Sequence, residues 1–209
     1  MRISYVIDLA ARRGMILAAI GCIVPAPAAL ADSLTVRVVD EHGAALQDVA
    51  MALKPLVGVP AMRAAEFEIV QRDKRFIPLM TAVPTGASIR FPNHDTVRHH
   101  VYSFSPAKTF ELKLYLGTPA APVVFDKPGV VVMGCNIHDH MVAYVVVFDS
   151  PWVGVSDEAG ELRLQGVPAG DYRLEYWHPR WVDADNSVAG TPVRIDGDAR
   201  FTLVVGAQP

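Results

Sequence analysis

Short runs rich in β-branched residues recur along most of the chain, and each run is bounded by Gly, Pro, Asn or Asp. They are LTVRVVD, VAMAL, ASIRF, HVYSF, PVVFD, GVVVMG, AYVVVF, ELRLQG, YRLEYW, PVRI and FTLVV. Alternation with a period of two, or a short apolar run between turn residues, is typical of a β-strand. No stretch of the sequence shows a long amphipathic helical period. The pattern therefore predicts an all-β chain, with Greek-key sandwiches as its architecture.

The first 31 residues differ from the rest and are typical of an export signal. Two arginines precede the apolar run MILAAIGCIV, and Ala29-Leu30-Ala31 offers a small-x-small cleavage site. Two prolines interrupt this apolar part, which is short for a membrane span. We therefore expect residues 1–31 to be removed and a periplasmic chain to begin at Asp32, with no transmembrane segment in the mature part.

Two variants of this export hypothesis stay open. The stretch ARRGMIL is similar to a twin-arginine signal, which would export the protein already folded. The stretch AAIGC offers a poor acylation site, which would leave a lipid on Cys22.

Charge and length limit the possible functions of the mature chain. Residues 1–31 contain three arginines and one aspartate, so their removal changes the net charge from −3 to −5. A mildly acidic chain argues against nucleic acid as a partner. About 178 residues would remain, which suffices for one domain of ordinary size or for two small ones.

Cys135 is the one cysteine of the sequence outside the predicted signal. A lone thiol in an oxidising compartment cannot form an internal disulfide and is liable to oxidation. Taken alone, Cys135 would be interpreted as a small buried apolar residue. Its neighbours argue for a metal, because GCNIHDHM gives the spacing Cys-x-x-His-x-x-Met with His138 and Met141. A short loop between the strands VVVMG and AYVVVF can turn these three side chains toward one point.

Thiolate, imidazole and thioether are the ligand types that suit copper. Two histidines, one cysteine and a long axial methionine form an electron-transfer copper site. The second histidine must come from elsewhere in the chain. The segment FPNHDTVRHHVYSF supplies candidates, because it contains a polar turn after the strand ASIRF.

That segment resembles the cupredoxin family, whose members carry a phrase like F-x-N-x-D-x-x-x-H-x-V before the first copper histidine. Phe91 to Val101 match this phrase, and the resemblance covers roughly residues 64–149. It implies a Greek-key sandwich with one type 1 copper ion, bound by His99, Cys135, His138 and Met141. The chain departs from the family at two places. His100 stands where many cupredoxins have Asn, and Asn136-Ile137 replace a common Thr-Pro, which puts the hydrogen bonding around the ligands in question.

Four longer phrases together resemble a narrower group, the exported cupredoxin-like proteins often labelled methylamine utilisation proteins. They are QRDKRFIPLMTAVPTG, FPNHDTVRHHVYSFSPAKTFELKLY, VFDKPGVVVMGCNIHDHM and EYWHPRW. The label implies a periplasmic bacterial copper protein. It does not by itself establish a role in amine oxidation.

The flanks resemble a different module, the carboxypeptidase regulatory-like sandwich, which is similar to transthyretin. Their D-x-x-G turns lie at Asp40 to Gly43 and Asp157 to Gly160, and VPAGDYRL provides a further tight turn. We expect residues 32–63 and 150–209 to form this module, with a cupredoxin domain at 64–149 between them. The cupredoxin is either inserted into one sandwich or joined to it in tandem.

Further polar residues cluster near the predicted ligands. His94, His100 and His140 are interpreted as surface or supporting residues, with a second metal site as the alternative and His140 as the first candidate for it. His99 and His100 should point to opposite faces of a strand. Asp95 is expected to stabilise the turn before His99 through backbone N–H groups, with Asn93 doing likewise.

Three strong ligands and one weak ligand leave no open position for a substrate, so we expect a carrier rather than an enzyme. The predicted function is one-electron transfer between periplasmic redox proteins, such as a cytochrome or an oxidoreductase. Analogy with cupredoxins suggests an apolar surface near His138, with Ile137, Val142 and Phe104 as candidates for it or for the core. Alternatives are copper storage or delivery, a structural sandwich with a vestigial motif, and a copper oxidase or ferroxidase that uses the extra histidines.

Overall fold

A computed structural model describes residues 32–58, 61–181 and 187–205 of the chain. The regular structure in these ranges consists of β-strands, apart from the short 3-10 helix η1 (Pro179–Trp181). The prediction of an all-β chain is therefore confirmed. No helix in the described ranges is long and apolar enough to cross a membrane. The predicted signal at 1–31 and the lipid site at Cys22 lie outside the described residues.

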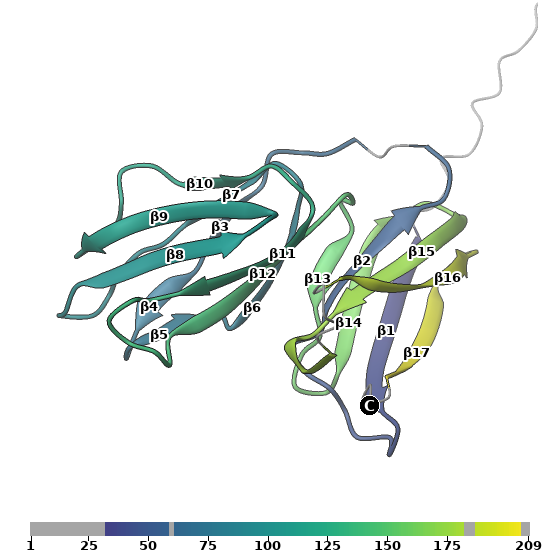
Figure 1. Ribbon diagram of the computed structural model, residues 1–209. Coiled ribbons are helices and arrows are strands. Elements are labelled where there is room, and N and C mark those ends of the chain that lie inside the picture. The colour runs from purple at the N-terminus through teal and green to yellow at the C-terminus, as the bar shows by residue number, and fades with distance from the viewer. Residues whose placement is uncertain (1–31, 59–60, 182–186, 206–209) are drawn as a thin grey trace, which may run out of the picture.

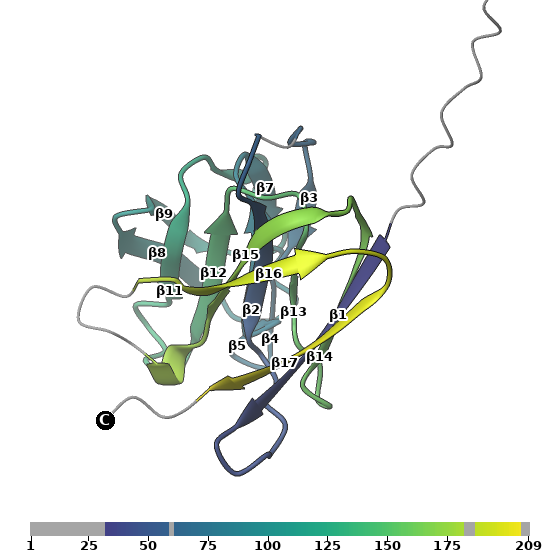
Figure 2. The same cartoon turned by 90° about the vertical axis from the view of Figure 1, so that its right-hand side faces the viewer.

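Strands from both ends of the chain form one sandwich, here called the terminal sandwich (Figure 1). One sheet has the order β14-β1-β17 and the other the order β13-β2-β15-β16. The strands are β1 (Asp32–Asp40), β2 (Ala50–Pro55), β13 (Val153–Val155), β14 (Glu161–Val167), β15 (Gly170–Trp177), β16 (Ala189–Ile195) and β17 (Ala199–Val205). Strand β1 runs antiparallel to β14 and parallel to β17. Figure 2 shows β1 and β17 side by side, so the first and last described strands share one sheet.

The strands between β2 and β13 form a second sandwich, here called the inserted sandwich. Its sheets have the orders β6-β12-β11-β8-β9 and β10-β7-β3, and β4 pairs with β5 in a hairpin. The strands are β3 (Glu66–Glu68), β4 (Val70–Arg72), β5 (Arg75–Ile77), β6 (Met80–Pro84), β7 (Ala87–Arg90), β8 (His99–Ser105), β9 (Lys108–Tyr115), β10 (Val123–Phe125), β11 (Gly129–Gly134) and β12 (Val142–Phe148). These strands occupy the segment predicted as 64–149, and the boundaries themselves stay a prediction.

The two sandwiches pack against each other through an apolar layer. Its buried members come from β2, β6, β11, β12 and the end of β15, and they are Ala50, Ala52, Met80, Ala82, Val130, Val146, Phe148 and Trp177. The layer explains a sequence pattern, because β6 is buried at every position whereas the partly exposed strand β9 alternates. A strand that is covered on both faces needs a continuous apolar run, and a strand with one wet face needs alternation.

The predicted D-x-x-G turns are present in the terminal sandwich. Asp157 Oδ1 accepts hydrogen bonds from the backbone N–H groups of Ala159 and Glu161, at 2.9 and 2.8 Å. Gly160 has a φ of +74°, and a Cβ there would lie 2.5 Å from the carbonyl oxygen of Val38. Both the backbone conformation and the close approach of β1 therefore require glycine at this position.

Candidate metal centre

The loop between β11 and β12 is short and closed by its own backbone. The N–H of Cys135 donates to the carbonyl of Met141 at 3.2 Å, and the N–H of Met141 donates to the carbonyl of His138 at 2.9 Å. Cys135 directly follows β11, and β12 begins one residue after Met141. All of β11 is paired with β12, so the two strands hold both ends of the loop and fix the direction of its side chains.

The loop brings two donors to a third on β8. The Nδ1 atoms of His99 and His138 lie 3.2 Å apart, and the Sγ of Cys135 lies 3.7 Å from Nδ1 of His138. One donor atom from each residue lies within 4.8 Å of the other two. His99 is fully buried and Cys135 is 4% exposed. One thiol and two imidazoles therefore converge at the edge of the core, and their binding of a metal stays a prediction.

Met141, the fourth predicted ligand, is 1% exposed and belongs to the same apolar core as Cys135. Its burial places the residue inside the inserted sandwich, at the end of the loop that also carries Cys135 and His138. Contact of its thioether with a metal stays a prediction.

Asp95 orients the histidine on β8. Its Oδ2 lies 2.7 Å from Nε2 of His99, so a proton on Nε2 is shared with the carboxylate and the Nδ1 lone pair is left on the side of His138. A partner of this kind fixes the tautomer of a metal-binding histidine. Burial by itself would raise the pKa of Asp95, but hydrogen bonds from the N–H of Lys74, from His99 and from the N–H of Asp73 hold this pKa below its usual range.

The role predicted for Asp95 needs a correction. Its backbone hydrogen bonds come from Asp73 and Lys74, at 2.7 and 3.0 Å, in the turn of the β4–β5 hairpin, and not from the turn before His99. That turn is stabilised by Asn93, whose Oδ1 accepts the N–H of Asp95 at 2.9 Å. Asp95 therefore links the hairpin to His99, which only the approach of β4 to this end of the sandwich makes possible.

The charges around His138 favour its neutral form. Partial burial lowers its pKa, and electrostatic interactions with His99, Lys74 and His140 lower it further, while Asp95 acts in the opposite direction. A neutral imidazole keeps a lone pair for a metal ion. The protonation state of His138 is therefore compatible with metal binding at neutral pH.

The remaining histidines of this region do not belong to the converging group of donors. His100 is buried on the opposite side of β8 from His99, where its Nε2 lies 2.9 Å from Glu111 and its ring contacts Tyr102. His94 is exposed, and its Nδ1 lies 3.1 Å from Arg72. His140 is exposed, with its ring centroid 6.1 Å from that of His138. In the described part of the chain, the converging donors are His99, Cys135 and His138, without these three.

Sequence reasoning missed two polar residues of the core near the donors, Gln71 and Tyr115. The Nε2 of Gln71 donates to the carbonyl of Phe91 at 3.1 Å and to the Tyr115 hydroxyl, which itself donates to Phe91 at 2.6 Å. Burial raises the pKa of Tyr115 to about 12, with a smaller contribution from the negative charge of Cys135. The sequence offered only a weak signal, because this glutamine follows Ile69 and Val70 but precedes the polar run RDK.

Apolar side chains are exposed near the ligand loop. Phe104 is 80% exposed and Ile137 is 49% exposed, so neither belongs to the core. Two grooves, of about 370 and 500 Å³, share Val142 at the start of β12. One is lined by Tyr102, Phe104, Ser105, Val132, Met133, Gly134 and Val142, and the other by Arg75, Phe76, Ile77, Leu79, His140 and Val142.

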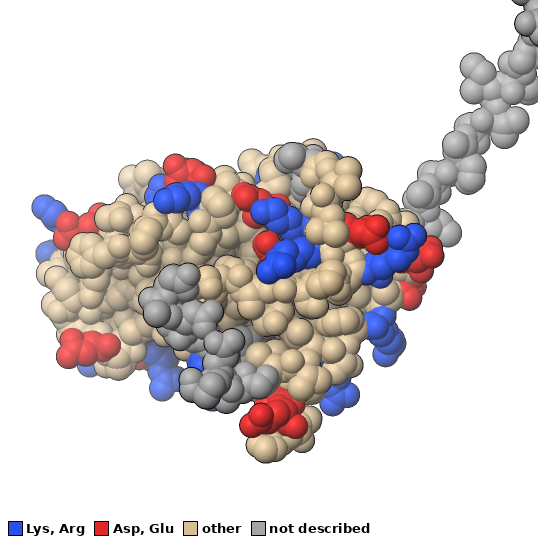
Figure 3. Space-filling view, turned by 45° about the vertical axis from the view of Figure 1, so that its right-hand side comes forward, with Lys and Arg blue, Asp and Glu red and all other residues tan. Residues whose placement is uncertain are grey.

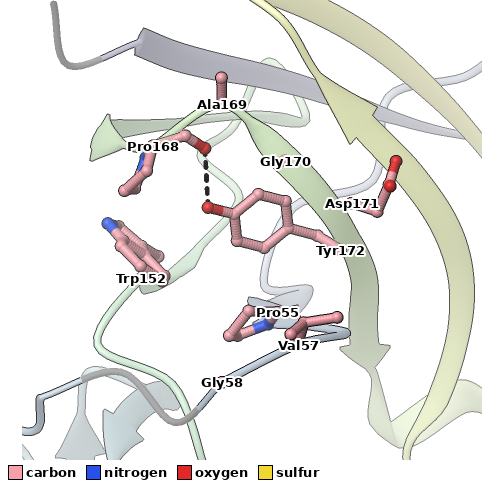
Figure 4. A pocket seen from close by; sticks show the side chains of 9 residues that line it. All are labelled: Pro55, Val57, Gly58, Trp152, Pro168, Ala169, Gly170, Asp171 and Tyr172. Atoms are coloured by element: carbon pink, nitrogen blue, oxygen red, sulfur yellow. Dashed lines mark hydrogen bonds between the residues drawn. The ribbon is translucent and has the colours of Figure 1, made fainter. Parts of the chain in front are cut away.

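A further pocket, of about 390 Å³, lies on the terminal sandwich (Figure 4). It is lined by Pro55, Val57, Gly58, Trp152, Pro168, Ala169, Gly170, Asp171 and Tyr172. The Trp152 indole donates to the carbonyl of Gly166 at 2.9 Å, and the Tyr172 hydroxyl donates to that of Pro168 at 2.7 Å. These bonds hold the aromatic walls of the pocket in place.

No family model and no curated protein matches this chain. The solved structures that resemble it include cupredoxins. A purple cupredoxin from Nitrosopumilus maritimus is 22% identical, with 39% of this chain and 98% of that one covered and a TM-score of 0.35. A pseudoazurin from Sinorhizobium meliloti is 18% identical, with 42% and 76% covered and a TM-score of 0.33. A copper-containing nitrite reductase from Thermus scotoductus is 22% identical, with 46% of this chain but only 25% of that one covered and a TM-score of 0.38.

Proposed function

We propose that this protein is an exported cupredoxin with one type 1 copper ion, which carries single electrons between redox proteins in the periplasm. The observation that carries the proposal is the convergence of Cys135 Sγ with the Nδ1 atoms of His99 and His138 at a largely buried position. A thiolate with two neutral imidazoles fits copper, and the copper ion, when bound, supplies one-electron exchange.

The chain's own residues would keep the site rigid and dry. Asp95 holds His99 in the tautomer that presents Nδ1, and the backbone bonds of the loop limit the movement of His138. Burial of Cys135 and Met141 excludes water from the core side. A site that changes little between two oxidation states suits a carrier, which must exchange electrons without rearrangement.

Two parts of the proposal, export and membership of a narrower group of cupredoxin-like proteins, rest on the sequence alone. We propose that residues 1–31 direct the chain to the periplasm, and that the protein belongs with the cupredoxin-like proteins labelled methylamine utilisation proteins. The terminal sandwich would be the carboxypeptidase regulatory-like module, with the cupredoxin inserted into it, because β1 and β2 pair with strands that follow β12.

The proposed partner is a cytochrome or an oxidoreductase that docks by an apolar contact surface. The two grooves that meet at Val142 expose Phe104, Ile77 and Leu79, and apolar surface of this kind is typical of protein contact sites. Lysine, arginine, aspartate and glutamate are interspersed over the face drawn in Figure 3, so no single charge dominates that face.

Copper delivery is the second candidate function, and it is favoured by the position of His138. This residue is only half-buried, and the exposed His140 lies beside it. A bound ion could pass from the half-buried His138 to the exposed His140, and from there to an acceptor protein. Transfer of Cu(I) to an acceptor protein, without a strongly coloured Cu(II) form, would identify this function.

The decisive experiment is the visible absorption and EPR spectrum of chain 32–209 loaded with Cu(II). We expect an intense thiolate-to-copper band with narrow copper hyperfine splitting, which is lost in Cys135→Ala and shifted in Met141→Leu. A colourless protein with wide splitting, the same in Cys135→Ala, would show that copper binds elsewhere and would sink the carrier function.

A further inference from the structure

Gln71 is a fully buried polar residue in the middle of β4. Its side-chain oxygen Oε1 has no hydrogen-bond partner. Among the described residues it shares this property with Thr81 Oγ1 and His100 Nδ1. Buried polar atoms are nearly always paired, so an unpaired one calls for an explanation.

The orientation of the Gln71 amide is fixed by its neighbours. Nε2 donates to the carbonyl of Phe91 and to the hydroxyl of Tyr115, and this hydroxyl donates to the same carbonyl. A flipped amide would place Oε1 against the Phe91 oxygen, with two acceptors facing each other. The nitrogen is therefore committed to Phe91 and Tyr115, and Oε1 remains unpaired in the core.

Gln71 lies close to the proposed ligands. Tyr115 is paired with His99 across β8 and β9, and directly opposed residues of an antiparallel pair project to the same face of the sheet. The negative charge of Cys135 also contributes to the raised pKa of Tyr115. The amide of Gln71 therefore contacts a side chain that neighbours His99 and responds to the charge of Cys135.

The backbone of Gln71 also takes part in holding this end of the sandwich. Its N–H donates to the carbonyl of Pro92, and its carbonyl accepts the N–H of His94, both at 2.8 Å. These bonds flank Asn93, whose Nδ2 donates to the carbonyl of Tyr115 at 2.9 Å. Because a backbone role needs no particular side chain, it does not explain why a glutamine with an unpaired oxygen occupies the position.

We propose that Gln71 is a positioning residue that tunes the metal centre through its buried side-chain amide. In a core of low dielectric, the dipole of this amide acts on the charge that a bound copper ion gains on oxidation. Gln71 thus shifts the reduction potential of the centre. This inference rests on the proposed copper site and adds a residue outside the ligand set to it.

The test is Gln71→Leu in copper-loaded chain 32–209, with Thr81→Val as the matched control. Each change removes a buried unpaired oxygen, but Thr81 lies on β6, at the opposite edge of the five-stranded sheet from β9, which carries Tyr115. Redox titration against a reference couple measures the equilibrium constant for reduction. We expect this constant to change about threefold in Gln71→Leu and to stay unchanged in Thr81→Val.

Urea unfolding of the metal-free variants separates tuning from a purely structural role. Gln71→Leu also removes the two hydrogen bonds of Nε2, and loss of one partner of a buried hydrogen bond is destabilising, so the copper-free variant should unfold at a lower urea concentration than the wild type. A stability change with an unchanged reduction equilibrium would overturn the inference. Gln71→Ile, which suits a strand, replaces Gln71→Leu if the latter does not fold.

The outcomes also separate this inference from the function on which it rests. A wild-type protein with the thiolate-to-copper band, whose reduction equilibrium is the same in Gln71→Leu, rejects the role of Gln71 alone. A wild-type protein without that band rejects the copper carrier and the tuning role together.

Discussion

At the residue scale, the geometry of the candidate metal centre depends on a carboxylate outside the predicted ligand set. Asp95 accepts hydrogen bonds from His99 and from two backbone N–H groups of the β4–β5 turn. Asp73 and Lys74 in that turn both have positive φ, at 53° and 56°. The turn thereby directs two consecutive N–H groups at one carboxylate, which keeps Asp95 charged and His99 oriented.

We expect Asp95→Ala to lower the affinity of the protein for Cu(II) by about 10- to 100-fold, because the ring of His99 loses the partner that fixes its tautomer. Competition with a chelator of known affinity measures the effect. Asp126→Ala is the control, since Asp126 is an exposed carboxylate that pairs with Lys108 at 2.8 Å. Equal affinities of the two variants would contradict the orienting role of Asp95.

At the scale of single elements, the β11–β12 loop and the D-x-x-G turns are set locally. Met141 lies six positions after Cys135 in sequence, and the hydrogen bond between them closes the loop. The turn at Asp157 to Gly160 relies on one carboxylate and one glycine. In each case a short sequence pattern contains all the groups that its geometry needs.

Two glycine variants test the turn. Gly160 and Gly166 both have positive φ, but a Cβ at Gly166 would meet open space. Gly166→Ala should lower the free energy of unfolding by about 1–2 kcal/mol, the usual cost of left-handed backbone for a residue with a Cβ. Gly160→Ala should cost at least about 1 kcal/mol more, because its Cβ meets the carbonyl of Val38. Urea denaturation measures both, and equal losses would refute the close approach of β1.

At the scale of the whole molecule, the two sandwiches are joined twice by the chain and once by an apolar layer. The chain enters the inserted sandwich after β2 and leaves it before β13. The layer buries Phe148 and Trp177 together with small residues of β2 and β6. Unfolding of one sandwich would therefore expose apolar surface of the other.

This coupling has a direct spectroscopic test, since all three tryptophans of the sequence lie outside the inserted sandwich. Tryptophan fluorescence follows the terminal sandwich and, through Trp177, the apolar layer, and the thiolate-to-copper band follows the inserted sandwich. We expect both signals to change at the same urea concentration. Phe148→Ala, which leaves a cavity in the apolar layer, should lower the free energy of unfolding by about 3–5 kcal/mol and move both transitions. Two separate wild-type transitions would contradict the coupling.

The sequence by itself determined the all-β class, the D-x-x-G turns and the loop that carries Cys135 and His138. These features depend on residues a few positions apart, and their spacing contains the necessary geometry. The separation of His99 from His100 follows in the same way, because alternate residues of a strand point to opposite faces.

Only the tertiary structure decided how distant segments meet. The sequence left open whether the middle segment is inserted or in tandem, and the pairing of β1 with β14 and β17 answers this for the strands. The tertiary structure also places the turn of the β4–β5 hairpin beside Asp95, and Gln71 beside Tyr115. Such contacts depend on strand register and on which sheet faces pack together, and neither is encoded in the local spacing of residues.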